Sequence, residues 1–318
     1  MDPVRLGLSM HPHGRAETAS RDLFKQIVAV ATAAEGSGFD SFWVGDHFYA
    51  QQTNDWTQPR LEAYGLLSAI GARTQRLKLG THVTAVTHRN PALLAKIVTT
   101  LDIISQGRAI LGLGAAWHVE EHESYGFSFP GVSERLDRLS EAVQICRLMF
   151  DDGEASFAGK YYSIAHAFNY PRPVQERIPI LIGGSGERRT LRLVAQYGDA
   201  CNLAGTAETL RHKLGVLERH ANETGRDSTK IVKTTTKMVV IDDTSAGARR
   251  AAEVARMNIG LSEEDFAGFA LVGNAGEVRE QAESILAVGM DGVVCTVPDP
   301  FDTESVTAVG NTLSGLGG

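Results

Sequence analysis

The sequence has few of the features that mark secreted, membrane-spanning or nucleic-acid-binding proteins. Its three cysteines, Cys146, Cys201 and Cys295, lie far apart and form neither a CxxC metal motif nor a disulfide framework, so we expect buried thiols in a reducing compartment. No apolar run is long enough to span a membrane, and no cationic stretch precedes a long apolar run at the N-terminus. The 31 basic residues are outnumbered by 38 acidic ones, which gives a net charge of −7 and no basic surface for nucleic acid or an anionic membrane. We therefore expect a cytoplasmic protein with neither of these partners.

Strand-like and helix-like segments alternate along almost the whole chain. Hydrophobic residues make up 43% of the sequence, which is enough for a large core. The predicted strands cover residues 4–10, 39–47, 77–84, 108–115, 178–184, 199–205, 230–241 and 290–298. Helix-like periodicity covers residues 20–37, 60–74, 91–105, 132–150 and 187–198, a segment ending near 224, residues 244–258 and 275–288, and the C-terminal segment.

Eight strand-then-helix units predict a (β/α)8 TIM barrel, an α/β fold, in a single domain over residues 1–318. Alternation of this kind favours a parallel sheet with helices outside it, and 318 residues suit a barrel of about 250 residues with insertions. The first strand–helix turn lacks GxGxxG, which counts against a dinucleotide-binding open sheet. We expect one insertion before strand 5, containing a hairpin, and a mostly helical one after strand 7, within 244–274.

Two other kinds of barrel chemistry have weaker signals. His11 and His13 after strand 1 form an HxH pair, but strand 4 has no lysine for a carbamate bridge and strands 5 and 6 end without histidine, so we expect no metal. Lys233 and Lys237 share one side of strand 7 and could include a Schiff-base nucleophile. Neither lysine lies at the carboxyl end of that strand, where barrel chemistry is expected.

The predicted strands carry polar, aromatic and small residues at their carboxyl ends. Asp46 and His47 follow the apolar run of strand 2, where a charged pair is costly unless it is solvated, hydrogen-bonded or functional. Gly112 and Gly114 on strand 4 would leave room for a flat ligand or make a tight corner. The other candidates are two aromatic residues and three polar strand residues: Trp117, Tyr125, Thr81, His82 and Asn202.

Strand 5 ends in Gly183, Gly184, Ser185 and Gly186, and we expect a helix to follow with Arg188 and Arg189 in its first turn. Free backbone N–H groups and the positive end of a helix dipole would make this turn a phosphate cradle. Glycine could also serve only to bend the chain. Taken with the other strand ends, the pattern indicates a site for a large, flat, phosphorylated cofactor of the flavin type.

Four blocks of sequence then carry a family resemblance: GFDSFWVGDH at 38–47, residues 87–117, residues 120–150 and residues 169–202. They resemble the luciferase-like monooxygenase superfamily. The ERxDRL helix and the PxPVQ…PILIGG junction are most similar to its branch that uses the deazaflavin coenzyme F420. The FMN branch shares most of these features, so FMN is kept as the alternative cofactor.

The resemblance implies a (β/α)8 barrel with a tricyclic ring in its mouth. Asp46 and His47 would lie near the ring, and the bond between His82 and Val83 would be a non-proline cis peptide in a bulge behind it. Gly114, Ala115 and Trp117 would border the ring and the substrate, and the residues from Gly183 to Gly186 would hold the phosphate. Sugar-phosphate dehydrogenases of the branch have a glutamate at the position of Trp117, which argues against that substrate class.

The resemblance also implies the activity. We expect an oxidoreductase that transfers a hydride between F420 and a small organic substrate, with His47 as the proton partner and Asp46 as a second catalytic residue. The alternatives are an FMN-dependent monooxygenase served by a reductase partner and a non-catalytic flavin-binding barrel. A homodimer is common in the family and is expected here.

Overall fold

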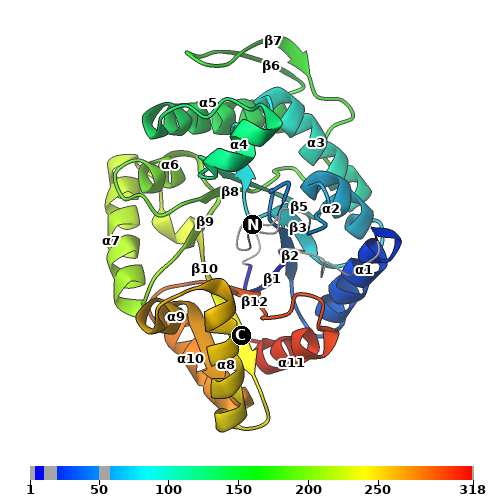
Figure 1. Ribbon diagram of the computed structural model, residues 1–318. Coiled ribbons are helices and arrows are strands. Elements are labelled where there is room, and N and C mark those ends of the chain that lie inside the picture. Colours follow the sequence, from blue (N-terminus) through cyan, green and yellow to red (C-terminus); the bar gives the residue numbers. More distant parts are fainter. Residues whose placement is uncertain (1–3, 11–19, 50–57, 317–318) are drawn as a thin grey trace.

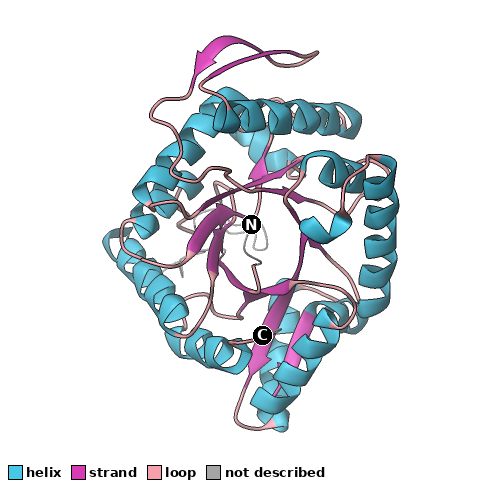
Figure 2. Cartoon of the chain, turned by 180° about the vertical axis from the view of Figure 1, so that it is seen from behind, coloured by secondary structure: helices cyan, strands magenta, loops and turns pink. Residues whose placement is uncertain are grey.

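Eight parallel strands close into a barrel in the computed structural model, which describes residues 4–10, 20–49 and 58–316. The ring closes because β10 pairs with both β9 and β12, and β12 pairs with β1. Figures 1 and 2 show the strands at the centre and the helices around them. The barrel strands are β1 (Leu6–Met10), β2 (Ser41–Val44), β3 (Lys78–Thr81), β5 (Ala109–Gly114), β8 (Ile180–Gly183), β9 (Ala200–Leu203), β10 (Val232–Ile241) and β12 (Gly292–Thr296). The predicted (β/α)8 TIM-barrel fold is confirmed.

The outer layer consists of amphipathic helices whose apolar faces pack on the strands. The outward side chains of the barrel strands, such as Leu6 and Leu8, join these helices in one core. The outer helices are α1 (Ser20–Gly36), α2 (Ala63–Gly71), α3 (Pro91–Ile104), α5 (Val132–Asp151), α6 (Thr190–Tyr197), α7 (Ala207–Glu223), α8 (Ser245–Ile259), α10 (Ala275–Leu286) and α11 (Thr303–Leu313).

The inside of the barrel is filled at its lower level by Trp43 of β2. The indole is fully buried and packs with inward-facing residues such as Ile110 and Val294. Gly7 and Gly80 make room for it, because a Cβ on Gly7 would lie 2.8 Å from Trp43 Nε1 and one on Gly80 would lie 2.7 Å from the indole ring. Trp43 therefore closes the barrel, and any ligand must sit above it at the carboxyl ends of the strands.

The third predicted strand is interrupted. Residues 77–84 form β3 and the short β4 (Thr84–Ala85), and the peptide bond between His82 and Val83 is cis, as the resemblance implied. β4 pairs with β5 beyond the point where β3 does. The chain therefore bulges at His82 and Val83 and pairs with β5 again opposite Leu113 and Gly114.

The insertion before the fifth barrel strand contains the predicted hairpin. β6 (Glu154–Ala158) and β7 (Ser163–Phe168) pair antiparallel and project from the outer layer near α3 and α5 (Figure 1). The loop after the hairpin is held by the buried carboxylate of Asp102 on α3. Asp102 Oδ2 accepts the backbone N–H of Val174 at 2.8 Å and that of Gln175 at 3.1 Å.

The later insertion is mostly helical, as predicted, but it also contains a strand that was not expected. After α8 come α9 (Glu263–Phe269) and a strand, β11 (Ala270–Gly273), which pairs in parallel with the last four residues of β10. β10 thus pairs with the barrel strands over residues 232–238 and with β11 over residues 238–241, which lie in this extension. Two further elements were not predicted, α4 (Val119–Tyr125) and the 3-10 turn η1 (Ser228–Lys230).

Candidate active site

A polar layer lies above Trp43 at the mouth of the barrel. The rings of His82 and Trp43 meet edge to face with centroids 6.0 Å apart. Asn202 of β9 is held by two hydroxyl groups of β10, donating to Thr234 Oγ1 at 3.0 Å and accepting from Thr236 Oγ1 at 3.1 Å. Burial lowers the pKa of His82 to about 4, although a hydrogen bond with Asn202 acts in the opposite direction. His82 is therefore a neutral imidazole at neutral pH.

Two inward-facing hydroxyl groups in this layer lack partners among the described residues. Ser9 at the end of β1 is 4% exposed, and neither its Oγ nor Thr296 Oγ1 at the end of β12 makes a hydrogen bond there. Ser9 shares the inner face with Trp43, its register partner on β2, and Thr296 shares it with Val294. Buried hydroxyls normally have partners, so this face fits a ligand that carries polar groups into the barrel mouth.

Thr81 was predicted to bind the cofactor, a role that its buried and hydrogen-bonded position does not favour. Its side chain is fully buried, and Thr81 Oγ1 donates to Gly112 O at 2.9 Å and lies 2.8 Å from Thr84 Oγ1. Thr84 is bonded in turn to the hydroxyl of Tyr64 on α2, at 2.6 Å. The three hydroxyl groups fix the bulge to β5 and α2, so Thr81 shapes the site without facing it.

The glycines of β5 and β8 lie against the bulge of the third strand. A Cβ on Gly112 would lie 1.9 Å from Thr81 O, and one on Gly114 or Gly183 would lie 2.7 Å from Val83 Cγ2. These glycines therefore give room to the bulge of the third strand, which supports the tight corner that the sequence left open beside the flat-ligand interpretation of Gly112 and Gly114. Ala115 follows with its carbonyl oxygen bonded to Arg135 Nε at 3.0 Å.

The turn between β8 and α6 is exposed at Gly184 and Gly186, and Gly184 has a φ of 112°. Helix α6 begins at Thr190, three residues later than predicted, and no side chain caps its N-terminus. Arg189 is the N-cap residue and binds Ser133 and Asp137 of α5, so neither Arg188 nor Arg189 lies in the first helical turn. The predicted phosphate cradle thus depends on backbone N–H groups and not on these arginines.

Asp46 is buried and bound to a cation. Its carboxylate accepts from Arg89 Nη1 at 2.6 Å and from Arg89 Nη2 at 3.0 Å, and Arg89 also binds Glu62 at 2.6 Å. Burial alone would raise the pKa of Asp46, but the nearby His88 ring and the charge and hydrogen bonds of Arg89 outweigh it and lower that pKa. Asp46 is thus an anchor for Arg89 behind the site, and its catalytic role stays a prediction that this geometry does not favour.

His47 meets a carboxylate that was not predicted. Its Nδ1 lies 2.9 Å from Oε2 of Glu121 on α4, while Glu121 Oε1 accepts the backbone N–H of Phe48 at 2.6 Å. The exposed indole of Trp117 stands edge-on to the His47 ring, with centroids 5.7 Å apart. Tyr125, also exposed, stacks on Phe48 with centroids 4.5 Å apart. The structure therefore brings His47, Trp117 and Tyr125 to one wall built around α4.

The two lysines of β10 do not face this site. Lys237 Nζ donates to the carbonyl oxygens of Gly205 and Gly268, and Lys233 Nζ lies 3.4 Å from Asp291 Oδ2. Because Thr234 and Thr236, which alternate with them, contact Asn202 inside the barrel, both lysines point to the outer face. This arrangement argues against a Schiff-base nucleophile here.

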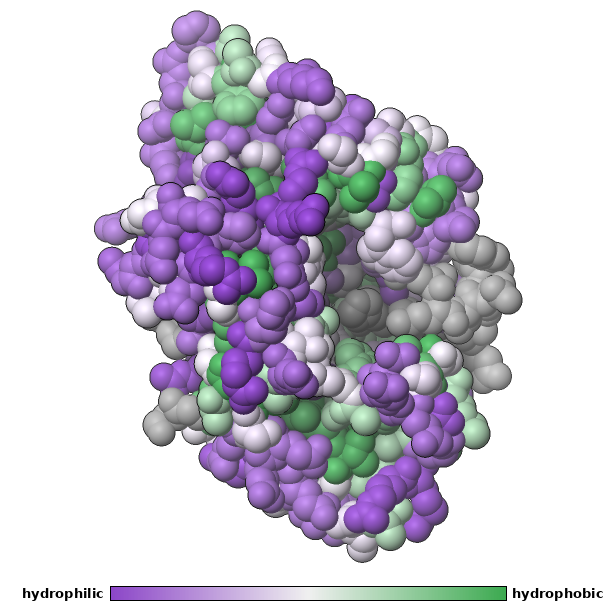
Figure 3. Space-filling model, turned by 90° about the vertical axis from the view of Figure 1, so that its left-hand side faces the viewer, coloured by the Kyte–Doolittle hydropathy of each residue, from purple (hydrophilic) through white to green (hydrophobic). Residues whose placement is uncertain are grey.

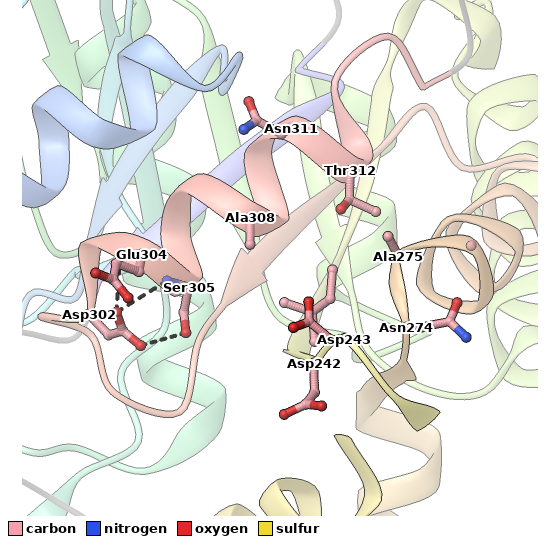
Figure 4. A pocket seen from close by; sticks show the side chains of 12 residues that line it. Asp242, Asp243, Asn274, Ala275, Asp302, Glu304, Ser305, Ala308, Asn311 and Thr312 are labelled. Carbon is pink, nitrogen blue, oxygen red and sulfur yellow. Dashed lines mark hydrogen bonds between the residues drawn. The ribbon is translucent and has the colours of Figure 1, made fainter. Parts of the chain in front are cut away.

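A cavity of about 610 Å³ lies between the extension of β10, the start of α10 and α11 (Figure 4). Its lining includes Asp242, Asp243, Asp302 and Glu304 and none of the predicted site residues. Acidic groups disfavour a phosphorylated ligand, so this cavity is not the predicted cofactor site. The side of the molecule that carries α6 and α7 is largely hydrophilic, with a hollow near its middle (Figure 3).

The described residues contain no group of three His, Cys, Asp or Glu placed to hold a metal ion, and His11 and His13 lie outside them. No helix in those parts of the chain is long and apolar enough to cross a membrane.

Comparison with known proteins decides the family. The model of the luciferase-like monooxygenase family matches residues 4–299. The chain belongs to the luciferase-like monooxygenase family. A curated relative, the F420-dependent glucose-6-phosphate dehydrogenase of Kineococcus radiotolerans, is 38% identical over 162 residues, which are 51% of this chain and 47% of the relative. The chain spans about half the length of the first curated relatives that it matches.

Solved structures confirm the fold of this family member. An F420-dependent secondary alcohol dehydrogenase in complex with an F420–acetone adduct superposes with a TM-score of 0.82, at 22% identity, over 98% of both chains. The oxygenating constituent of 3,6-diketocamphane monooxygenase from Pseudomonas putida, in complex with FMN, superposes with a TM-score of 0.78, at 19% identity, over 98% of both chains. The predicted superfamily is confirmed, and the relatives named here are oxidoreductases, in agreement with the predicted enzyme class.

Proposed function

We propose that this protein is an oxidoreductase that binds the deazaflavin F420 at the barrel mouth and transfers a hydride between it and a small organic substrate. The structural observation that carries the proposal is the polar layer above Trp43, in which Ser9 and Thr296 present buried hydroxyls without partners among the described residues. Curated relatives named as F420-dependent enzymes support the deazaflavin over other flavins.

The chain supplies three kinds of groups for such a cofactor. Ser9, His82 and Asn202 offer polar atoms to the edge of a ring lying above Trp43. The exposed turn from Gly184 to Gly186, before an uncapped helix, offers backbone N–H groups and a positive dipole end to a phosphate. When bound, the deazaflavin ring supplies the carbon that accepts or gives the hydride.

His47 is the proposed proton partner. Its Nδ1 is occupied by Glu121, and no described residue bonds to its Nε2, on a side chain that is 17% exposed. Nε2 can therefore take the proton of a substrate hydroxyl in oxidation or return a proton in reduction. Trp117 and Tyr125 beside it form an aromatic wall, which favours an alcohol or carbonyl compound with an apolar body over a sugar phosphate.

The second candidate is an FMN-dependent monooxygenase with a reductase partner. The likeness to the monooxygenase of Pseudomonas putida favours keeping it, because that protein has the same fold and was solved in complex with FMN. A non-catalytic flavin-binding barrel is the third and makes the same binding predictions without turnover. Activity assays with an alcohol series and F420 therefore separate it from the first proposal.

The test is a fluorescence titration of the purified protein with F420 and with FMN. We expect binding of F420 and a Kd that is at least about tenfold higher in Ser185→Asp, because about 1.4 kcal/mol of repulsion by the phosphate corresponds to that factor. The matched control is Ser284→Asp on the exposed face of α10, which should leave the Kd unchanged. Tight binding of FMN without binding of F420 would contradict the deazaflavin, and binding of neither would contradict the whole proposal.

A further inference from the structure

Glu121 is the third residue of helix α4, and its carboxylate is buried beside His47, the proposed proton partner. Its side chain has no exposure to solvent, and its two oxygens take the Nδ1 of His47 and the N–H of Phe48. Burial would raise the pKa of Glu121, but the hydrogen bond and charge of His47 and the N–H of Phe48 outweigh it and lower that pKa. An ionised carboxylate only accepts hydrogen bonds, so His47 must donate Nδ1–H to it.

The surroundings hold Glu121 in place from several elements. Its own N–H donates to Nδ1 of His118, the N-cap residue of α4, at 3.2 Å. His122 Nδ1 donates to His118 O at 2.6 Å, and Thr87 Oγ1 lies 2.6 Å from His122 Nε2. These contacts join α4 to the chain after β4, so the carboxylate position follows from a bonded framework rather than from one flexible side chain.

His88 stands between Glu121 and the buried Asp46. Its Nε2 lies 3.8 Å from Glu121 Oε2 and its Nδ1 lies 3.6 Å from Asp46 Oδ2, while the side chain is 1% exposed. The charge of Arg60 also acts on Glu121. The groups that face this carboxylate are therefore His47 from the loop after β2, His88 from the loop before α3, His118 at the N-cap of α4, His122 within α4, and Arg60.

We infer that Glu121 is a positioning residue that fixes His47 in the tautomer with hydrogen on Nδ1 and so makes Nε2 the basic atom toward the substrate. In alcohol oxidation, the hydroxyl proton passes to Nε2, the carbon-bound hydrogen leaves with its electron pair to the deazaflavin, and the carbonyl forms. The resulting imidazolium is balanced by the Glu121 carboxylate at 2.9 Å. Reduction returns the same proton and hydride. The inference rests on the proposed function, but the tautomer can be measured without any cofactor.

The first test is nitrogen NMR of His47 in the ligand-free protein. We expect the Nδ1–H tautomer of neutral His47 in the wild type. In Glu121→Gln, the amide can accept from Phe48 N–H with its oxygen and donate to Nδ1 with its nitrogen, which forces the Nε2–H tautomer. A wild-type His47 in the Nε2–H tautomer, or in rapid exchange between both, would overturn the inference even if the variant failed to fold.

The second test is turnover with F420. Glu121→Gln should lose about 10²- to 10⁴-fold in kcat, the range of general acid–base catalysis, with the Kd for F420 unchanged and the pH profile of kcat shifted. Glu123→Gln, an exposed carboxylate on the same helix, is the matched control and should behave as the wild type. A Glu121→Gln enzyme with normal turnover and an unshifted profile would sink the inference while the proposed function stands. Failure of the wild type to bind F420 would sink the proposed function and leave the NMR result to decide the tautomer.

Discussion

At the scale of single residues, different neighbours favour different roles for the two histidines of the site, His82 and His47. His82 is turned into the barrel over Trp43, and its partner is the neutral amide of Asn202. His47 is turned toward the ionised carboxylate of Glu121. A neutral surrounding keeps the first ring uncharged, whereas a carboxylate can balance a proton on the second. A hydrogen-bonding role therefore suits His82, and a proton-transfer role suits His47.

The charge state of His82 gives a prediction. Because burial lowers its pKa from 6.5 to about 4, the imidazole signals of His82 should titrate with a midpoint near that value in NMR spectra. Unfolded His82 would take up a proton near its ordinary pKa while folded His82 does not, so this residue lowers the stability as the pH falls from 6.5 toward 4. His82→Gln identifies the signals and should remove this contribution. A midpoint at 6.5 or higher would show that the ring is not buried as described.

At the scale of elements, the site depends on how closely β5 and β8 approach the bulge of the third strand. Val83 fills the space above Gly114 and Gly183, and Thr81 O fills that above Gly112. Side chains on these strands would push the bulge out of place, because protein interiors have no spare volume. The glycines therefore act through packing, which favours the tight corner over the flat-ligand interpretation of Gly112 and Gly114.

This packing predicts the outcome of a double-mutant cycle. Gly183→Ala should destabilise the protein by about 1–3 kcal/mol, the usual cost of overpacking, because its Cβ would lie 2.7 Å from Val83 Cγ2. Val83→Ala removes the opposing atoms, so the double variant should lose less than the sum of the two single changes. Gly36→Ala at the end of α1, where a Cβ meets nothing within 4 Å, serves as the control. Strictly additive effects in urea denaturation would refute the contact.

The same scale shows which elements the sequence could predict. The main alternation was readable because each barrel strand is a short buried run and each long helix has an apolar stripe. Helix α4 was missed because it is only seven residues long and rich in glutamate, although Gly126 at its C-cap was a usable signal. β11 was missed because four residues between two helices are too few to show the alternation of apolar and polar residues that indicates a strand. Because α4 was not predicted, Glu121 was not recognised as the partner of His47.

At the scale of the whole molecule, charge is buried where the strand ends meet the loops that cover them. Asp46 lies in the loop after β2 and Glu121 in α4, and both carboxylates are buried with cationic or histidine partners from other segments. No local window of sequence could reveal this, because the partners lie tens of residues apart. The barrel was predictable from periodicity, whereas the charge network follows only from the closed fold. The contribution of this charge network to stability therefore exists only when the whole barrel is folded.

This network predicts how the stability of the protein depends on pH. The folded state lowers the pKa of Asp46 and of Glu121 below the ordinary values of 3.8 and 4.5, because partner contacts outweigh burial. The unfolded chain therefore binds protons first, and the stabilisation, fully present above these values, is lost as the pH falls through them. Urea unfolding at a series of pH values should show this loss in the wild type and a shallower one in Asp46→Asn, whatever its absolute stability. Glu123→Gln, which removes an exposed carboxylate, should keep the wild-type slope. Equal slopes for the wild type and Asp46→Asn would mean that Asp46 is not held ionised by Arg89 in the folded barrel.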